Sequence, residues 1–571
     1  MEPRKPRLWP AYVILGIQVV SIGLSVTPQI NNMVRFIYMM AGPLVCGCLF
    51  LAWLLFASRL RWQERLAVPL GAAVLGVIAG LFVDETMRVT LWIYGVPLVM
   101  LLVTLAESLF TSWQPKSRMK LILTVVACGW AVFATGRLAG FDGSYWPQFR
   151  WRWRPTEEQL LIERERAQPH AGGTAQIELS ADDWPGFRGA GRNSRIADLA
   201  VRTDWDSTPP KELWRIPVGP AWSSFACVDN RLFTQEQRGG SEAIICYDAG
   251  TGEEIWRQSY ETRFSEVVSG AGPRATPTFA DGRLYTMGAK AALNCLDAAT
   301  GEPIWQRDLV AEIGAKIPMW GFASSPLVTG EHVIVYADGR DDQGLVAYDR
   351  HTGDPVWHVP AGGMNYTSAQ PATIAGVDLA LFVDESGLLG IDPSDGKVLW
   401  QFKPDGLKPF LMVQPQQIDD HSVVMPLGDG VGVVRVDIER DGATWHVTQR
   451  WTSRHLKPSF NDFVYHEGHL YGFDQNIFTC VDAETGKRKW KQGRYGFGQV
   501  LLAEASSSLI ITCESGEIVH LAADPTQHRE LGRIQALDGK TWNHPIVAAG
   551  RLFIRNSAEA ACYALPVFGD S

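Results

Sequence analysis

The stretch ICYDAGTGEEIW, residues 245–256, decides the fold because variants of it recur along the chain. Each copy has a short apolar run, an Asp, a turn that contains Gly, and then a Trp. Self-similarity with a period of roughly 40–50 residues is typical of repeat architectures, whose single units cannot bury a core alone. The other close copies are LNCLDAATGEPIW (293–305), VAYDRHTGDPVW (346–357), LGIDPSDGKVLW (389–400) and TCVDAETGKRKW (479–490), and a looser copy ends at Trp451.

Each repeat predicts a four-stranded antiparallel unit. Residues 275–305 contain short apolar runs separated by turn signals at Asp281-Gly282, near Gly288 and at Thr300-Gly301. Runs this short with turns this regular indicate strands, and helical periodicity is lacking. Gly supplies the positive φ that a tight turn needs, and the Asp carboxylate accepts from the turn amides. We therefore expect the blades of a propeller, with each Trp on the outer strand packing against the neighbouring blade.

Counting the repeats gives eight blades. The seventh, about residues 499–534, keeps the strand pattern but lacks the Asp, the Gly and the Trp. The eighth contributes only three strands after residue 543, so we expect residues 212–218 to supply its fourth. Closing the ring with both ends of the domain removes a free sheet edge. The first six blades end at Trp256, Trp305, Trp357, Trp400, Trp451 and Trp490.

The first 140 residues are strongly apolar and predict a transmembrane region of about five helices. Each stretch is near the 20 residues that cross the hydrocarbon core of a bilayer. Lys and Arg gather at the amino terminus and in the second and fourth connections. The positive-inside rule then predicts a multi-pass protein of the bacterial inner membrane, with a cytoplasmic amino terminus and a periplasmic propeller. The predicted spans are about 9–27, 34–57, 66–83, 89–110 and 119–139.

Residues 141–181 form the predicted interfacial segment and linker. SYWPQFRWRWRP, residues 144–155, alternates aromatic rings with arginines, which is typical of a belt at the membrane interface. A docking collar for lipid or a partner is the alternative. The soluble domain is expected to run from Asp182, in DDWPGFRGAGRNS, to Ser571.

The cysteines and the net charge exclude some classes of function. No CxxC or adjacent Cys-Cys pair occurs, so buried free thiols are favoured over a disulfide framework. The net charge of −9 provides no basic surface for nucleic acid. Two positions before each repeat Asp the side chain is small, which indicates a crowded slot near the propeller core: Cys246, Cys295, Ala347, Gly390 and Cys480.

The repeated Asp-x-x-Thr-Gly-x-x-x-Trp resembles the repeat of eight-bladed propellers of the pyrroloquinoline-quinone (PQQ) type. The resemblance covers roughly residues 182–566 and includes WPGFRG, WGFASSPLV, GRYGFGQ and KTWNHP. Two kinds of protein share this repeat: quinoprotein alcohol and glucose dehydrogenases, and the non-enzymatic lipoprotein of the outer-membrane assembly machinery. The five predicted helices also resemble the layout of membrane-bound glucose dehydrogenase, which passes electrons to ubiquinone. The resemblance therefore implies either a catalyst or a scaffold.

The candidate site is the mouth of the central channel, which is ringed by residues that come just before each innermost strand. Aromatic rings suit a flat cofactor such as PQQ, and Arg or amide groups suit its carboxylates. The alternative is that these side chains plug the channel and bond to one another. Aligning the repeats places there Trp222, Arg274, Trp320, Tyr366, Gln414, Asn461, Asp462, Arg494, Tyr495, Trp542, Asn543 and His544.

Three features weigh against an enzyme. There is no vicinal Cys-Cys pair of the kind that alcohol dehydrogenases place over PQQ, and the repeats lack long insertions. Ca²⁺ would need a carboxylate and amide cluster with an Asp as general base. Asn461 and Asp462 are the best candidates for that metal and base, with Asn543 and Asp384-Glu385 as neighbours. We therefore predict a binding or assembly scaffold for partners in the cell envelope, and the alternative is a PQQ-dependent dehydrogenase of sugars or alcohols.

One ionisable residue lies within the predicted membrane region. Glu107 is near the end of the fourth span. A charge at such depth indicates a functional group by default, for example in a quinone or proton path. The alternative is a carboxylate near the interface that pairs with Lys116 or Arg118.

Overall fold

The computed structural model describes residues 6–27, 30, 32–165, 177–363 and 365–568. It divides into two compact units. The first comprises Met1–Pro155 and Val267–Gly270, and the second comprises Thr156–Glu266 and Ala271–Ser571. Part of the predicted linker within residues 141–181 lies outside the described residues.

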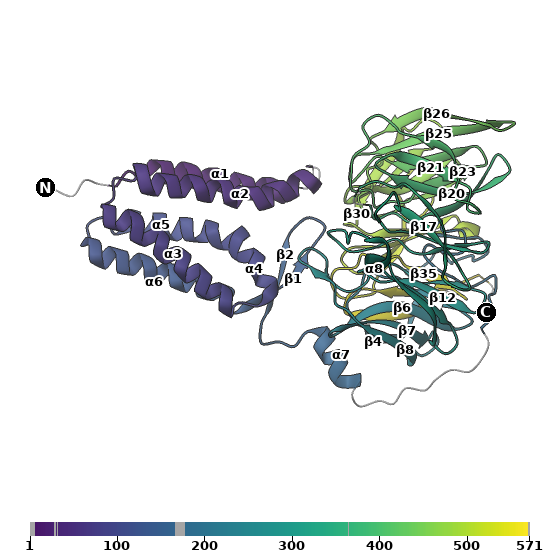
Figure 1. The fold of residues 1–571 in the computed structure, drawn as a ribbon, viewed down its shortest axis with the longest axis horizontal. Coiled ribbons are helices and arrows are strands. Elements are labelled where there is room, and N and C mark those ends of the chain that lie inside the picture. Colours follow the sequence, from purple (N-terminus) through teal and green to yellow (C-terminus); the bar gives the residue numbers. More distant parts are fainter. Residues whose placement is uncertain (1–5, 28–29, 31, 166–176, 364, 569–571) are drawn as a thin grey trace. The chain divides into compact units, whose positions relative to one another are not determined.

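The first unit is a bundle of helices followed by a two-stranded hairpin (Figure 1). Helices α1 and α2 lie side by side, and α6 packs on both α3 and α5. The faces turned inward form one apolar core that includes Cys46, Met100 and Val126. The elements are α1 (Trp9–Ser25), α2 (Asn32–Ala52), η1 (Trp53–Ala57), α3 (Trp62–Phe82), η2 (Glu85–Met87), α4 (Arg88–Thr90), η3 (Leu91–Gly95), α5 (Val96–Leu109), α6 (Pro115–Phe133), β1 (Gly136–Phe141) and β2 (Pro147–Trp151).

The prediction of five membrane spans is corrected to three. Within the described residues, Val34–Ala57, Trp62–Phe82 and Glu85–Leu109 are long and apolar enough to cross a bilayer. Helix α1 has 17 residues, or about 25 Å at the usual rise per residue, which is short of the hydrocarbon thickness. Helix α6 opens with PKSRMK, whose three cations occupy its first two turns. Apolar composition alone could not distinguish these two helices from spans.

The second unit is an eight-bladed propeller of four-stranded antiparallel blades, as predicted. In blades one to seven the chain enters at the innermost strand and leaves at the outermost strand, so the repeats follow one another around a central axis. Blades one to four are β5–β8 (Ala226–Val228, Arg231–Arg238, Ser241–Asp248, Glu254–Glu261), β11–β14 (Thr278–Ala280, Arg283–Met287, Ala292–Asp297, Pro303–Asp308), β15–β18 (Leu327–Thr329, His332–Tyr336, Leu345–Asp349, Pro355–Val359) and β19–β22 (Gln370–Ile374, Val377–Asp384, Gly387–Ile391, Val398–Phe402).

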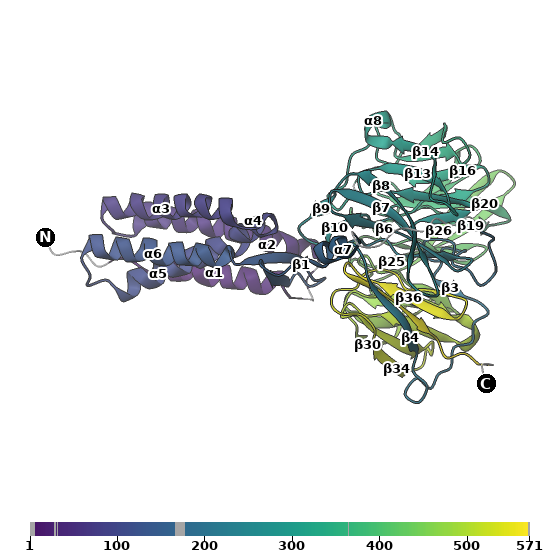
Figure 2. The ribbon, with the colours of Figure 1, turned by 90° about the horizontal axis from the view of Figure 1, so that it is seen from below.

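The last blades confirm the predicted closure. Strand β4 (Lys211–Pro217) pairs antiparallel with β37 as the fourth strand of blade eight, and Figure 2 shows teal β4 beside the yellow strands of that blade. A short strand, β3 (Arg195–Ile196), adds in parallel to the inner strand of blade seven. Blades five to eight are β23–β26 (Gln416–Asp419, Ser422–Pro426, Val433–Asp441, Thr444–Ser453), β27–β30 (Val464–His466, His469–Asp474, Ile477–Asp482, Arg488–Arg494), β31–β34 (Gln499–Ala503, Ser508–Thr512, Glu517–Ala522, Glu530–Gln535) and β35–β37 (Ile546–Ala548, Arg551–Arg555, Glu559–Ala564) with β4.

The repeated motif joins neighbouring blades through a hydrogen bond. The Asp carboxylate accepts from the turn amides, as Asp248 does from Gly250 and Thr251 at 2.9 and 2.8 Å. The Trp indole N–H donates to a backbone carbonyl in the corresponding turn of the next blade. The acceptors are Ala298 for Trp256 (3.0 Å), Arg350 for Trp305 (3.1 Å), Pro393 for Trp357 (3.2 Å), Ala483 for Trp451 (3.0 Å) and Asp524 for Trp490 (2.8 Å).

The turn glycine and the small residue before the Asp both make room for this Trp. Gly301 has φ +77, and a Cβ there would lie 2.5 Å from the ring of Trp256. The small residue lies directly opposite the Trp in the same blade, as Cys246 does across from Trp256. The crowded slot predicted from the sequence is therefore beside the outer strand and not at the propeller axis. Seven of the nine free cysteines are buried, which is consistent with small apolar fillers.

Two blades depart from the pattern. Blade five replaces the Asp-Thr-Gly turn with the long β25–β26 hairpin, and the indole N–H of Trp400 has no partner among the described residues. Blade seven was predicted to lack the Asp, yet Asp524 caps the equivalent turn by accepting from Thr526 at 2.8 Å. Its turn, Asp-Pro-Thr, has no glycine, so the sequence pattern alone did not identify it as a copy of the repeated turn. The remaining elements of this unit are α7 (Glu157–Glu165), β9 (Ser265–Glu266), β10 (Gly270–Ala271), α8 (Leu309–Ile313) and η4 (Glu504–Ser506).

Candidate functional site: the central channel

A ring of hydrogen bonds lines the channel where the inner strands begin. In six consecutive blades, one backbone N–H donates to a side chain at the equivalent place in the next blade. Blade eight completes the ring, because Ser224 donates to His544 O at 2.6 Å and Gln499 to Trp542 O at 3.2 Å. The six bonds run Ser224→Thr276 (3.0 Å), Thr276→Ser325 (2.9 Å), Ser325→Ser368 (2.9 Å), Ser368→Gln414 (2.8 Å), Gln414→Asp462 (3.0 Å) and Asp462→Gln499 (3.2 Å).

Asp462 is the one carboxylate in this ring, and protein groups surround it. Its Oδ2 lies 3.5 Å from Arg188 Nε and 3.0 Å from His544 Nε2, and Oδ1 accepts from Gln414 N. Burial raises the pKa of Asp462, but the charge of Arg188 and the hydrogen bond from His544 outweigh it and leave the pKa below the ordinary value. Asp462 is therefore an ionised partner of an internal cation.

Arg188 belongs to a segment, residues 184–196, that we call the plug because it runs across the inner strands. Trp184 pairs with Cys227 of blade one, and Pro185 O accepts from Phe279 N of blade two. Ser194 O accepts from Leu502 N of blade seven at 2.9 Å. Three residues that are not glycine hold left-handed backbone here: Arg188 (φ 62), Arg192 (φ 49) and Ser194 (φ 56). Such conformations cost free energy and persist only where the surroundings fix them.

The plug carries more positive charge than its surroundings compensate. Arg192 is 5 % exposed and donates to the carbonyls of Pro326 and Ser325 at 2.8 and 3.0 Å. It forms no ion pair with the described residues, and its guanidinium stacks over Phe187 at 5.5 Å. Burial and then the charge of Arg188 lower the pKa of Arg192 to about 9, so it remains a cation at neutral pH.

Aromatic rings gather at the end of the channel where the chain enters the inner strands. We call this set, which comprises Trp222, Trp320, Tyr366, Phe410, Phe460, Phe497 and Trp542, the aromatic mouth. One group runs from Trp222 to Trp542 (4.9 Å between ring centroids) and on to Phe460 (4.9 Å). The other joins Trp320 to Tyr366 (5.2 Å) and Phe410 (5.9 Å). Lys540 Nζ lies 4.3 Å from the Trp542 ring and 5.1 Å from the Trp222 ring.

The structure places nine of the twelve predicted site residues in the aromatic mouth or inside the channel and the other three elsewhere. Trp222, Trp320, Tyr366 and Trp542 are in the aromatic mouth. Gln414, Asn461, Asp462, Asn543 and His544 are inside the channel, where the Asn543 amide donates to Ser223 O at 2.7 Å. Arg274 lies beside Glu266 (3.5 Å) and over the ring of Phe264. Arg494 is exposed at the end of β30, and Tyr495 is buried against His528 and Glu530 of blade seven.

The donor set in the channel does not fit PQQ with its Ca²⁺. Among the described residues no group of three or more His, Cys, Asp or Glu side chains could hold a metal. Asp462 is already neutralised by Arg188. Asp384 is buried and accepts from Gly362 N (2.8 Å) and Ser386 N (2.7 Å), so it caps a turn. A Ca²⁺ site needs several free oxygen ligands, and these carboxylates are committed elsewhere.

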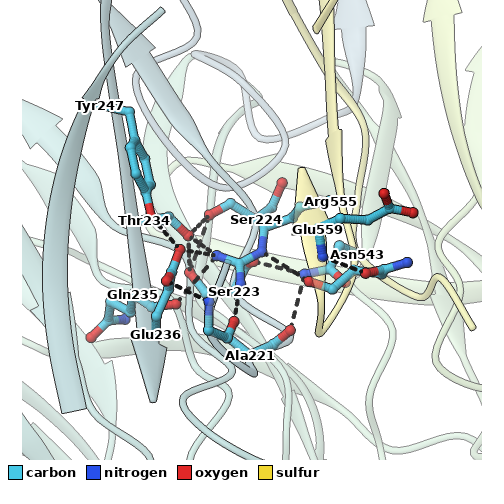
Figure 3. Close-up of polar contacts among 12 residues, drawn as sticks. Ala221, Ser223, Ser224, Thr234, Gln235, Glu236, Tyr247, Asn543, Arg555 and Glu559 are labelled. Carbon is cyan, nitrogen blue, oxygen red and sulfur yellow. Dashed lines mark hydrogen bonds and ion pairs between the residues drawn. The ribbon is translucent and has the colours of Figure 1, made fainter. Parts of the chain in front are cut away.

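The seam that closes the ring is held by a second buried charge cluster (Figure 3). Arg555 of blade eight reaches into blade one, where it donates to Thr234 Oγ1 at 2.7 Å and Gly219 O at 2.8 Å. It also lies 3.5 Å from Glu236, which is fully buried and accepts from Tyr247 at 2.9 Å. Burial raises the pKa of Glu236 to about 7, although Arg555 opposes that shift. Glu236 also pairs with Arg238 at 2.7 Å and accepts from Gly219 N at 2.7 Å, so buried polar and charged contacts hold the seam between blades eight and one.

Sequence reasoning missed Arg188, Arg192 and the small hydroxyl residues of the ring. Arg188 lies 274 positions before Asp462 in the numbering (462 − 188), so no local pattern links them. The ring residues Thr276, Ser325 and Ser368 follow Ala, Ser and Thr and have no shared motif. The one available signal was the glycine-rich plug sequence PGFRGAGRNS, which predicts tight backbone turns.

Comparison with known proteins agrees with this fold. Residues 240–408 match the family model described as outer membrane protein assembly factor BamB. No curated protein sequence matches the chain significantly. BamB from Moraxella catarrhalis is 13 % identical with a TM-score of 0.46, over 62 % of this chain and 100 % of that one. Quinohemoprotein alcohol dehydrogenase from Comamonas testosteroni is 13 % identical with a TM-score of 0.41, over 73 % and 83 %. The family model covers only part of the second unit, whose strand order shows it to be an eight-bladed propeller.

Proposed function

We propose that this protein is a scaffold of the bacterial inner membrane whose periplasmic propeller binds protein partners of the cell envelope. The observation that carries the proposal is that Asp462 is already paired with protein groups. The one carboxylate of the channel ring is paired with Arg188 at 3.5 Å and with His544 at 3.0 Å. A dehydrogenase of this fold would need that region open, with carboxylates converging on a metal.

The location rests on the distribution of cations in the first unit. The amino-terminal segment and the connection between α2 and α3 meet at one end, where Arg7 N donates to Ser58 O at 2.9 Å. Cations cluster near that end, and the positive-inside rule assigns such a cluster to the cytoplasm. Helix α6 begins at that end, where Arg118 lies 2.6 Å from Glu64 near the start of α3, and runs away from it to Phe133, so the chain leaves the bundle at the opposite end, which the rule assigns to the periplasm. The cations concerned are Arg7, Arg59, Arg61, Arg65, Lys116, Arg118 and Lys120.

The aromatic mouth is the proposed contact surface for the partner. Five of its seven rings are only partly buried, and Tyr366 and Phe497 are buried. The loop before Trp320 exposes Ile317 (41 %) and Met319 (47 %). Aromatic residues and Met are enriched in protein interfaces, where a few of them contribute most of the binding free energy. Site-specific photo-crosslinking in native membranes tests this surface. A crosslinker at Met319 should give a discrete adduct that is lost in Trp320→Ala, whereas one at Val398 on an outer strand should not.

The alternative function is a PQQ-dependent dehydrogenase of sugars or alcohols that reduces membrane quinone. The observation in its favour is the aromatic mouth, where Lys540 lies between two indole rings and could face a flat anion. The full chain in detergent micelles should be titrated with PQQ plus Ca²⁺, followed by tryptophan fluorescence and dye reduction. We expect no saturable quenching. Tight binding that is lost in Trp320→Ala or Lys540→Ala, with dye turnover, would establish the dehydrogenase instead.

A further inference from the structure

The plug contains a buried cation without a counter-charge. Arg188 lies close enough to Arg192 for its charge to lower the pKa of Arg192. Asp462 is the carboxylate that pairs with Arg188. Arg192 itself contacts only carbonyl dipoles, and its Nε has no acceptor among the described residues. A buried charge that is neither paired nor fully hydrogen-bonded is costly. Arg192 therefore provides a place for an anion from solution.

A polar pocket of about 320 Å³ lies beside this cation. Its floor is made by the plug and by the inner strands of blades four and five, β19 and β23. The Asn193 side chain makes no hydrogen bond within the described part of the chain. The opposite rim carries two exposed carboxylates, Asp419 and Asp420. Arg195 also lines the pocket, but its charge is already paired with Glu504. The polar groups of the lining are Arg192, Asn193, Arg195, Gln370, Gln416, Gln417, Asp419 and Asp420.

The charges on the two sides of the pocket restrict what it can take. Arg192 and Asn193 suit a carboxylate, since a guanidinium and an amide both donate to such oxygens. Asp419 and Asp420 would repel a second negative charge but attract an ammonium group. The volume is at the lower end of the range for small-molecule sites, about 300–1,000 Å³. A multiply charged phosphate or dicarboxylate is therefore disfavoured.

We propose that this pocket binds a small zwitterionic carboxylate, of the class of free amino acids and short peptides. The carboxylate is held at Arg192 and Asn193, and the ammonium group faces Asp419 and Asp420. The site is separate from the aromatic mouth, which comes before the inner strands, and does not depend on the scaffold function.

Calorimetric titration of the full chain in detergent micelles tests the site with a dipeptide and two analogues, each of which lacks one of its charged groups. L-alanyl-L-alanine is the probe, N-acetyl-L-alanyl-L-alanine lacks its ammonium group, and L-alanyl-L-alaninamide lacks its carboxylate. We expect saturable binding of the dipeptide, and affinities weaker by about tenfold or more for both blocked forms. Inorganic phosphate should not compete.

Three variants connect the binding to named residues. Arg192→Lys keeps the charge but loses the Nε donor, and should weaken dipeptide binding by about tenfold. Asp420→Asn should weaken the dipeptide and leave the N-acetyl form unchanged. Asp354→Asn, an exposed carboxylate outside the pocket, is the matched control and should change nothing. If Arg192→Lys does not fold, Asn193→Ala replaces it, with weaker dipeptide binding expected.

Several results would overturn the proposal. These are no binding of the dipeptide to the wild-type chain, equal binding of both blocked forms, or phosphate competing at equal concentration. Dipeptide binding that persists unchanged in Asp420→Asn and in Arg192→Lys or Asn193→Ala would also overturn it, because the ligand would then lie elsewhere.

Discussion

The helical bundle and the propeller each bury a cluster of charges, and the two clusters are unbalanced in opposite directions. In the bundle, Arg118 lies 2.6 Å from Glu64 and 3.3 Å from Glu107, so one cation faces two carboxylates. In the propeller, Arg188 and Arg192 have only Asp462 beside them within the described residues. All six side chains are buried.

The two clusters differ in how their excess charge can be neutralised. A surplus carboxylate becomes neutral when it takes up a proton, so the bundle needs nothing but water to balance its charges. An arginine keeps its proton at neutral pH, even with the pKa of Arg192 lowered to about 9. The cation-rich cluster therefore depends on an anion from outside, and the acid-rich cluster does not.

The largest effect is expected when the cation-rich cluster loses its one carboxylate. Asp462→Asn leaves Arg188 buried without a counter-charge, although its hydrogen bonds to Ser194, Gln416 and Phe463 remain, and removes the carboxylate beside His544. We expect a loss of about 3–5 kcal/mol in the free energy of unfolding. Thermal unfolding in detergent micelles, followed by intrinsic fluorescence, measures it. Asp354→Asn removes an exposed carboxylate that pairs with Arg307, and should cost at most about 1 kcal/mol. Equal effects of the two substitutions would show that the plug is not held by charge.

How far the sequence predicts the structure depends on how local each cause is. The blade count, the outer-strand Trp and the closure by residues 212–218 follow from a repeated local pattern, and the structure confirms them. The number of spans does not follow from apolar runs alone, because α1 is short and α6 begins with cations. The repeat register correctly pointed to positions before the inner strands, and four of the twelve predicted residues lie in the aromatic mouth.

The missing parts of the candidate site come from contacts that are distant in sequence. Arg188 reaches Asp462, and Arg192 reaches Ser325, from a loop that carries no repeat. Arg494 was aligned with the mouth because it precedes an inner strand, yet it belongs to the end of β30, and Phe497 provides the ring of that blade. Alignment of repeats cannot detect a segment that crosses them.

A smaller effect distinguishes the two carboxylates of the acid-rich cluster. Glu64→Gln removes the charge that accepts from Arg118 at 2.6 Å and should lower the free energy of unfolding by about 1–3 kcal/mol. Glu107→Gln removes the surplus charge, whose two oxygens accept no hydrogen bond from the described residues, and should change it by less than about 0.5 kcal/mol. Titration with SDS in mixed micelles, followed by the helical circular dichroism signal, compares them. A larger loss in Glu107→Gln than in Glu64→Gln would contradict the assignment of the surplus charge.

The smallest effect is expected in the seam cluster, where the charges are more nearly balanced. There the balance changes when Glu236 takes up or loses a proton, and no ion from solution is needed. The pKa of Glu236 rises from about 4.5 to about 7 on folding, so the folded state binds its proton more tightly than the unfolded state. This contribution is complete below about pH 4.5 and is lost as the pH rises through about 7. Between about pH 6 and pH 7.5 the free energy of unfolding should fall by about 1 kcal/mol, and in Glu236→Gln this fall should disappear. Thermal melts at matched ionic strength measure both chains, and parallel pH profiles would mean that Glu236 stays ionised beside Arg238 and Arg555 throughout.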